Sequence, residues 1–345
     1  MEPIPLCKGQ LILAETHDLA VYQGACGADC AAALAPSAGA CMPVAEAVRE
    51  SVPVGCVVEG IPGPEGVSGG QPHPTEALIG QYKDLLRQGI PEQADFLYLR
   101  GTDSFASLRC AVLAATDLTG RSIMAEVPVG ADGVLPFGTD IVAAVAVLQR
   151  IGVGTVIVSG EAAQDVADAL ARCAPYARVS LGARVDPSWL AGDVRFTNAE
   201  LYVPRRAEDI GALRAALAAY TGAVQVPRDH DGLLIAPDGT NAHFIDPMID
   251  ISDGIECDSH LGELLLEAED GSGAYKILLQ EEEDLICFEE HVFMLARPVC
   301  LCAEQPELLE KALRIYPGRA LYDGTWELDA RLTRYFSEKY GMICL

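Results

Sequence analysis

Basic residues are scarce in this chain. Its 345 residues include 24 Lys and Arg against 50 Asp and Glu, which gives a formal net charge of −26 at pH 7. A surface of this sign repels phosphate backbones and anionic lipids, so nucleic-acid binding and membrane binding are excluded from the functions considered. The same excess of acidic groups favours solubility.

Long apolar runs and a secretion-type start are also missing. No stretch reaches the roughly eighteen apolar residues of a membrane-spanning helix. The opening MEPIPLCKGQ has no basic segment followed by an apolar one, so we expect an unsecreted, cytoplasmic protein whose 12 cysteines are reduced. Several cysteines lie within apolar patterns and are expected to pack as small hydrophobic residues: Cys56, Cys110, Cys173, Cys300 and Cys344.

The common short catalytic motifs are absent. The first strand-like run leads into Glu15-Thr16-His17-Asp18 without G-x-G-x-x-G, which argues against an open nucleotide-binding sheet. There is no P-loop, no H-E-x-x-H and no G-x-S-x-G. Ser159 precedes a glycine but lacks the rest of the nucleophile motif, so a hydrolase is weakly supported.

Short apolar runs alternate with amphipathic stretches along the first two thirds of the chain. The runs lie at 11–15, 54–59, 96–100, 122–127, 155–159, 179–182, 199–203 and 223–226. Helical patterns lie between them, at 74–89, 162–173 and 208–220. Such alternation requires parallel strands joined by crossover helices, and about eight units in this length predict a closed (β/α)8 barrel over residues 1–230. The small-residue stretch at 24–41 is expected to form a loose helix or a loop.

A second, smaller α/β domain is predicted over residues 231–345. A turn-rich connection follows residue 228, and carboxylates are frequent after it. Strand-like runs at 276–279, 299–302, 320–322 and 342–345 then alternate with helical patterns near 284–295, 308–316 and 328–336.

Polar residues stand at the carboxyl ends of the predicted barrel strands, where barrel enzymes hold their sites. An arginine among carboxylates could bind a zwitterionic amino acid through charge-assisted hydrogen bonds. The alternative is that these groups only satisfy one another at the rim. The candidates are Glu15, Glu59, Arg100, Asp103, Glu126, Ser159 and Glu161.

Other polar clusters have structural explanations. The group Cys26-x-x-x-Cys30 with Cys41 lacks the paired spacing of zinc sites. Cys300 and Cys302 face the same way on a predicted strand and could touch one ligand, but two buried thiols are favoured. We expect Asp258 or Ser259 before His260 to cap a helix rather than to bind metal, and the acidic run 281–284 to begin another helix.

Residues 54–217 resemble the homocysteine S-methyltransferase barrel, the homocysteine-binding domain of cobalamin-dependent methionine synthase. The matching segments are VVEGIPGPEG (57–66), ALIGQYKDLLRQGI (77–90), DFLYLRGTDSFASLRCAVLAA (95–115), GADGVLPFGTDIVAAVAVLQRIGVGTVIVSG (130–160) and AEDIGALRAAL (207–217). The resemblance implies a closed barrel, methyl transfer to a thiol and a place in methionine and one-carbon metabolism.

The family activates the acceptor thiol with a zinc ion held by three thiolates. In this chain the aligned positions hold Gly160, or Ser159 in the neighbouring register, and the pair Tyr202-Val203. The glutamate that ends one family strand aligns with Arg100. Every expected zinc ligand is therefore replaced, and no metal is predicted at the barrel mouth.

The tail segment 297–327 is similar to the central part of pterin-binding barrels. The strand-end Asp of that family aligns with Cys302, and its strand-end Asn aligns with Asp323. Over so short a match the similarity points to a one-carbon origin and does not establish folate binding.

Two functional hypotheses follow from the sequence. In the first, the chain is a homocysteine S-methyltransferase-like enzyme that transfers a methyl group to a thiol or related amino-acid acceptor. Glu15 or His17 would act as general base, with Ser159 and Glu161 at the reacting edge; the ligand would be held by Glu59, Arg100, Asp103 and Glu126. In the second, the pocket is kept and the chemistry is lost, which leaves a binding protein or partner subunit. A corrinoid or folate-linked protein is the candidate partner.

Overall fold

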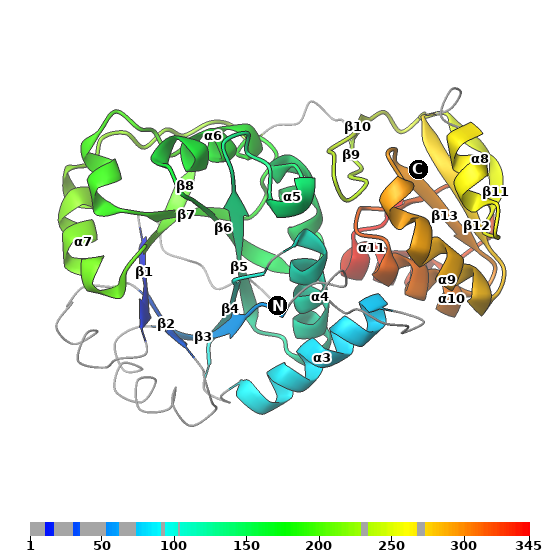
Figure 1. The fold of residues 1–345 in the computed structure, drawn as a ribbon, viewed down its shortest axis with the longest axis horizontal. Coiled ribbons are helices and arrows are strands. Elements are labelled where there is room, and N and C mark those ends of the chain that lie inside the picture. Colours follow the sequence, from blue (N-terminus) through cyan, green and yellow to red (C-terminus); the bar gives the residue numbers. More distant parts are fainter. Residues whose placement is uncertain are drawn as a thin grey trace.

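The computed structural model describes residues 11–16, 30–34, 53–61, 74–90, 94–102, 104–228, 234–267 and 273–345, and only the backbone of 14–16 and 30–34 and of residue 137. The chain folds as an α/β protein, with a (β/α)8 barrel followed by a smaller C-terminal α/β domain (Figure 1). No helix in the described part is both long and apolar enough to cross a membrane.

Eight parallel strands close the barrel in sequence order, and β1 pairs with β8 to complete the circle. The strands are β1 (Leu11–Thr16), β2 (Cys30–Leu34), β3 (Val54–Glu59), β4 (Phe96–Arg100), β5 (Ser122–Val129), β6 (Val153–Gly160), β7 (Ser180–Val185) and β8 (Ala199–Pro204). Seven of them overlap runs that the sequence predicts.

The second strand and the predicted eighth run differ from the sequence prediction. Residues 30–34 form β2 instead of a loop or loose helix, because they pair in register with β1 and β3. Residues 223–226 do not form a barrel strand, and only Val224 makes an isolated bridge, to Thr197. Pairing with neighbouring strands has overridden local composition in both places.

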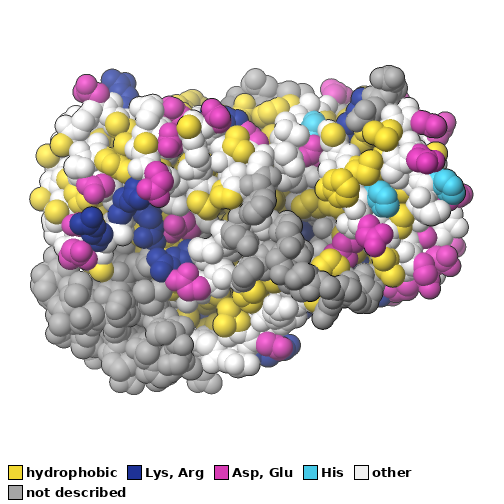
Figure 2. Space-filling model, in the orientation of Figure 1, with side chains coloured by type: hydrophobic (Ala, Val, Ile, Leu, Met, Phe, Trp, Pro, Cys, Tyr) yellow, Lys and Arg dark blue, Asp and Glu magenta, His cyan; other side chains and the backbone are white. Residues whose placement is uncertain are grey.

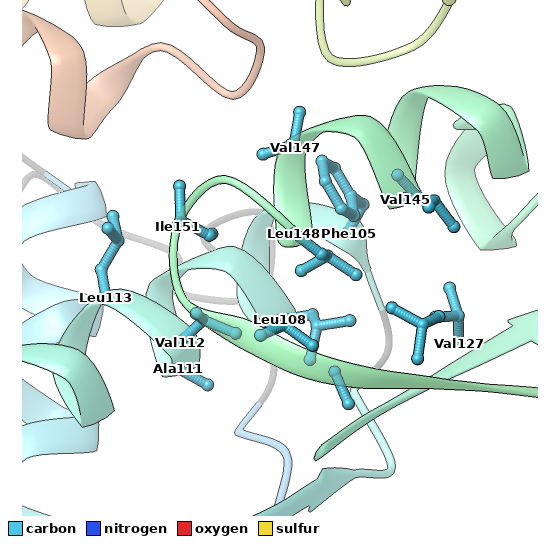
Figure 3. Close-up of a cluster of buried hydrophobic side chains, with 14 of the residues drawn as sticks. Phe105, Leu108, Ala111, Val112, Leu113, Val127, Val145, Val147, Leu148 and Ile151 are labelled. Carbon is cyan, nitrogen blue, oxygen red and sulfur yellow. The ribbon is translucent and has the colours of Figure 1, made fainter. Parts of the chain in front are cut away.

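Helices cover the outside of the barrel, and three of them, α3, α6 and α7, lie where the periodicity predicts. They are α3 (Pro74–Gly89), α4 (Phe105–Leu118), α5 (Ile141–Leu148), α6 (Ala163–Cys173) and α7 (Ile210–Ala219). Ser104 caps α4 by accepting from the Ser107 amide, and Asp140 caps α5 by accepting from Val142. Apolar side chains from α4, α5 and β5 meet in the layer between helices and sheet (Figure 3).

The C-terminal domain is built on a five-stranded parallel sheet in the order β11–β12–β13–β14–β15. Its elements are β11 (Ile251–Glu256), α8 (Leu261–Glu267), β12 (Ala274–Leu279), α9 (Glu282–His291), β13 (Val299–Ala303), α10 (Pro306–Ile315), β14 (Leu321–Tyr322), α11 (Ala330–Tyr340) and β15 (Ile343–Cys344). A short antiparallel pair, β9 (Leu234–Ile235) and β10 (Phe244–Ile245), precedes it.

The predicted helix start in the acidic run 281–284 is confirmed, but the predicted cap at Asp258 or Ser259 is not, because both residues lie in the turn before His260, which precedes α8. Glu281 and Asp284 form a capping box at the start of α9. Asp258 accepts from the His260 amide at the turn before α8. Acidic side chains gather on this domain on the face shown in Figure 2. Strand β11 was not predicted, because residues 251–256 (Ile-Ser-Asp-Gly-Ile-Glu) contain only two apolar residues, separated by Ser, Asp and Gly.

One buried apolar cluster joins the two domains. It contains residues of α3 and α4 from the barrel and residues of α9, α10 and α11 from the C-terminal domain, which lie side by side in Figure 1. The predicted burial of Cys56, Cys110, Cys173 and Cys300 is confirmed, whereas Cys344 is exposed.

Candidate active site at the barrel mouth

The barrel interior has an apolar floor. One buried cluster takes one or two residues from each of β1, β3, β4, β5, β6 and β8. They point into the lumen: Leu13, Val57, Phe96, Tyr98, Met124, Ile157, Leu201 and Val203. Since side chains alternate along a strand, the residue two positions further on points the same way, one layer nearer the carboxyl end. That rule gives Glu59, Arg100, Glu126 and Ser159, all among the predicted site residues.

Arg184 of β7 joins the polar residues above the apolar floor, and it was missed by the sequence prediction. Its Nη2 lies 3.0 Å from the Glu126 Oε2 on β5, and it donates to the Tyr98 Oη on β4 at 3.0 Å. Tyr98 in turn donates to Glu126. Because β7 is not adjacent to β4 or β5, this guanidinium spans the lumen. The predicted run ended at residue 182, two residues short of Arg184.

A second ion pair lies on neighbouring strands. Arg100 Nη2 lies 2.6 Å from Glu59 Oε1, and Arg100 Nε donates to the same oxygen at 2.9 Å. Gly101 follows with φ +67°, and a Cβ there would lie 2.7 Å from Glu59 Oε2. The glycine therefore leaves room for the carboxylate. Side-chain exposure is 55% for Glu59 but 14% for Glu126, so the two pairs differ in access to water.

Arg205 adds a third cation beyond the end of β8. It donates to the Glu161 Oε2 at 2.9 Å and to the Gly160 carbonyl at 3.1 Å, and it stacks 5.4 Å from the Trp189 ring centroid. The Glu161 side chain is 95% exposed, so this predicted residue lies at the outer rim. Ser159 is buried at the end of β6.

Three predicted residues carry no side-chain description. Glu15 stands on β1 two positions after Leu13, the register of the lumen-facing residues, but only its backbone is described. His17 and Asp103 lie outside the described residues. The structure thus brings together Glu59 with Arg100, and Glu126 with Tyr98 and Arg184.

The positions aligned with the family's zinc thiolates do not fit a zinc ion. Gly160 offers no side chain, and a Cβ there would lie 3.1 Å from the Val129 carbonyl oxygen. Tyr202 is fully buried in the helix-facing core, 6.4 Å from the Phe196 ring. Val203 faces the lumen with an apolar side chain. These three positions therefore offer no thiolate to a metal ion.

Among the described residues, the atoms that could hold a metal lie together in the C-terminal domain, at Cys300, Cys302 and Asp323. A hydrogen bond between the two thiols raises the pKa of Cys300 and lowers that of Cys302. Burial opposes ionisation of Asp323, but hydrogen bonds from Lys276 and Thr325 outweigh it and lower the pKa of this carboxyl.

No known protein family matches the chain, and no curated protein does. Solved structures do match, among them the homocysteine methyltransferase MmuM from Escherichia coli. Its apo form is 18% identical, covers 61% of this chain and 96% of its own, and has a TM-score of 0.46. Its metallated form is 17% identical over 60% of this chain and 96% of its own, with a TM-score of 0.45.

An orotidine 5'-monophosphate decarboxylase from Methanocaldococcus jannaschii also matches, at 11% identity over 60% of this chain and 97% of its own, with a TM-score of 0.36. At these identities and scores the likeness assigns no activity to this chain. The barrel itself is established by its strand pairing.

Proposed function

We propose that the barrel is a homocysteine S-methyltransferase-like module that holds a small amino acid or amino-acid thiol at its mouth, as the acceptor in a methyl transfer. The observation that carries this proposal is the ion pair of Arg184 with Glu126. It is joined by the hydroxyl of Tyr98 and lies next to the apolar floor to which the Tyr98 ring belongs. A guanidinium suits the ligand carboxylate, a glutamate suits the ammonium, and the floor suits an apolar or sulfur-containing side chain.

The two arginines have separate roles in this proposal. Arg184 lies inside the lumen, so it would take the ligand carboxylate while Glu126 takes the ammonium. Arg100 and Glu59 lie at the ends of β4 and β3, and they would contact the ligand on the side that faces the entrance of the barrel. Both pairs are preformed, so ligand binding exchanges ion pairs at the mouth and avoids burying new charge.

The acceptor thiol would lose its proton to a carboxylate of the mouth, since the aligned residues supply no metal. Glu15, on the same register as the lumen-facing residues of β1, remains the proposed base, with His17 as the alternative. A corrinoid or folate-linked protein is the methyl donor that the resemblance implies.

A second candidate function is ligand binding without catalysis. Gly160, Tyr202 and Val203 favour this second function. None of them carries a thiolate that could hold a metal ion for activation of the acceptor thiol. Calorimetric titration of methionine and homocysteine, followed by methyl-transfer assays with several donors, separates the two functions. Binding with transfer supports the enzyme, and binding without transfer supports the second candidate.

The binding site itself is tested by two variants and a matched control. Arg184→Met and Arg100→Met should each weaken amino-acid binding by about 10–100-fold, the value of a charge-assisted hydrogen bond. Arg87→Met should leave binding unchanged, because Arg87 lies on the exposed face of α3, where it pairs with Asp84. An amine that lacks the carboxylate should bind weakly to all of them. Equal affinity in Arg184→Met and in the unmodified protein would refute the site.

A further inference from the structure

A pair of buried thiols and a carboxylate meet at the carboxyl end of the C-terminal sheet. Cys300 and Cys302 are alternate residues of β13, so their side chains share one face of the sheet. Their relative exposures are 0% and 3%. They pack with Ala236 and Ile245 of the β9–β10 segment, on the face opposite the helices. Asp323 follows the neighbouring strand β14 and reaches the same point.

The distances between the possible ligand atoms are slightly longer than those around a bound zinc ion. The Sγ atoms of Cys300 and Cys302 lie 4.0 Å apart, and Cys302 Sγ lies 3.8 Å from Asp323 Oδ1. All three ligand atoms lie within 4.8 Å of one another. A tetrahedral zinc ion with ordinary bond lengths places two sulfurs about 3.8 Å apart and a sulfur and an oxygen about 3.5 Å apart. The two measured distances would each shorten by a few tenths of an ångström, and the third, between Cys300 Sγ and Asp323 Oδ1, would close from at most 4.8 Å.

The neighbouring groups hold the carboxylate in place. Lys276 of β12 lies beside Cys300 in the strand register, and its Nζ lies 2.5 Å from Asp323 Oδ2. The Thr325 hydroxyl donates to the same oxygen at 2.8 Å. Asp323 Oδ1 is the oxygen nearest the thiols. Carboxylates that bind metal ions are usually held in this way by hydrogen bonds from a second layer of residues, here Lys276 and Thr325.

The charges also balance. Two thiolates and one carboxylate carry three negative charges, which a divalent ion and the Lys276 ammonium neutralise together. In a site this buried, an uncompensated charge would be costly. The lysine next to the ligands therefore complements a divalent ion.

We propose that Cys300 Sγ, Cys302 Sγ and Asp323 Oδ1 bind one thiol-preferring divalent ion of the zinc class. The chain supplies three ligands, which leaves a fourth position for water or a small exogenous ligand, an arrangement typical of exchangeable sites rather than closed structural ones. This proposal is independent of the function proposed for the barrel.

A disulfide between the same cysteines is the competing possibility, and the strand argues against it. Cys300 and Cys302 belong to a central strand that pairs with β12 on one side and β14 on the other. A disulfide needs the sulfurs about 2.05 Å apart with a defined dihedral angle, which alternate residues of a regular paired strand do not offer.

Cobalt titration of the reduced protein, residues 1–345, tests the site. We expect one Co²⁺ per chain with a thiolate-to-cobalt charge-transfer absorption, which excess Zn²⁺ abolishes. Cys300→Ser and Cys302→Ser should each weaken binding by more than about 100-fold, since even outer partners of metal ligands are worth about 10–100-fold. Cys344→Ser, in the same domain but outside the cluster, is the matched control and should bind as the unmodified protein does.

The remaining cysteines provide the decisive comparison. A triple variant, Cys26→Ser with Cys30→Ser and Cys41→Ser, removes the cysteine group near the start of the sequence and should keep the absorption. X-ray absorption of the zinc-loaded unmodified protein needs no variant, and should show two sulfur ligands with lighter donors. Absence of charge transfer, its loss only in the triple variant, or a sulfur count other than two would overturn the proposal.

Discussion

The guanidinium of Arg109, in a barrel helix, donates to the main-chain carbonyl of Arg314 in the C-terminal domain at 2.6 Å. It also donates to the Leu313 carbonyl at 2.5 Å. Both carbonyls belong to the last turn of α10, where a helix leaves its acceptors unpaired. Burial lowers the pKa of Arg109 to about 10, so it remains charged at neutral pH. A side chain of one domain thus caps a helix of the other.

Replacing this cap should loosen the docking of the two domains. Arg109→Met keeps an apolar stem but leaves two buried carbonyls without donors, at a cost of about 1–3 kcal/mol each. We expect a lower free energy of unfolding in urea, with the single transition splitting in two as the domains separate. Arg87→Met on α3 is the control and should change stability by less than about 0.5 kcal/mol. Equal stability of the two variants would contradict the capping role.

Asp117 links the domains ionically and should make stability depend on pH. Its carboxylate lies 2.5 Å from Lys83 Nζ and 3.0 Å from Lys339 Nζ on α11. Burial opposes its ionisation, but the two lysines outweigh burial and lower the pKa of this carboxyl below the usual 3.8. Because the folded pKa is the lower one, the stabilisation is present above about pH 4 and is lost as the pH falls through the folded value.

Asp117→Asn should therefore lower the free energy of unfolding by about 1 kcal/mol at neutral pH. The difference from the unmodified protein should shrink progressively when urea unfolding is repeated at pH values falling below about 4, because the unfolded carboxylate takes up its proton first and the folded one follows as the pH passes its lowered pKa. Asp84→Asn, in an exposed pair with Arg87, is the control for a general charge effect. A difference for Asp117→Asn that persists undiminished in acid would count against the ionic link.

Gly55 on β3 should tolerate no side chain. An added Cβ would lie 2.1 Å from the Phe96 Cε2, and that ring is buried in the barrel lumen. Gly55→Ala should lower stability by about 1–3 kcal/mol, the usual cost of overpacking a core. Gly80→Ala is the matched substitution, on helix α3 with open space around the new methyl group. It should raise stability by up to about 1 kcal/mol. Thermal unfolding compares the two directly.

The geometry of the guanidinium at the mouth should matter as well as its charge. Arg184→Lys keeps the charge but cannot bridge Tyr98 and Glu126 as the planar fork does. We expect amino-acid affinity to fall by about 10-fold in Arg184→Lys and further in Arg184→Met. Calorimetry with the same ligand checks the order. Full affinity in the lysine variant would mean that charge alone suffices.

The barrel could be predicted from sequence because most of its strands are bounded apolar runs with β-branched residues, such as Thr155–Val158. The exception is β2, whose sequence Cys-Ala-Ala-Ala-Leu has no strand preference of its own. Its pairing partners on both sides decide its structure, in the register of Leu13 with Cys30 and Ala31 with Val54. Strand pairing of this kind depends on residues far away in the sequence, so the local composition of residues 30–34 could not predict it.

The pair of Glu59 and Arg100 at the barrel mouth could be predicted by the same means. Glu59 and Arg100 end apolar runs on adjacent strands, so their meeting follows from the strand order. Arg184 was missed because Ala183 and Val185 extend the strand past the glycine at which the prediction ended. Asp323 was placed at a strand end, but only the folded sheet shows that it reaches the two thiols.

We propose above that the barrel mouth holds a small amino acid through its arginines. A crystal structure of the protein with methionine or homocysteine tests it most directly. We predict that the ligand carboxylate lies within hydrogen-bond distance of the Arg184 or Arg100 guanidinium, with its side chain on the floor formed by Met124 and Ile157. A ligand seated outside the lumen, or an empty mouth at saturating ligand with both ion pairs intact, would contradict the account.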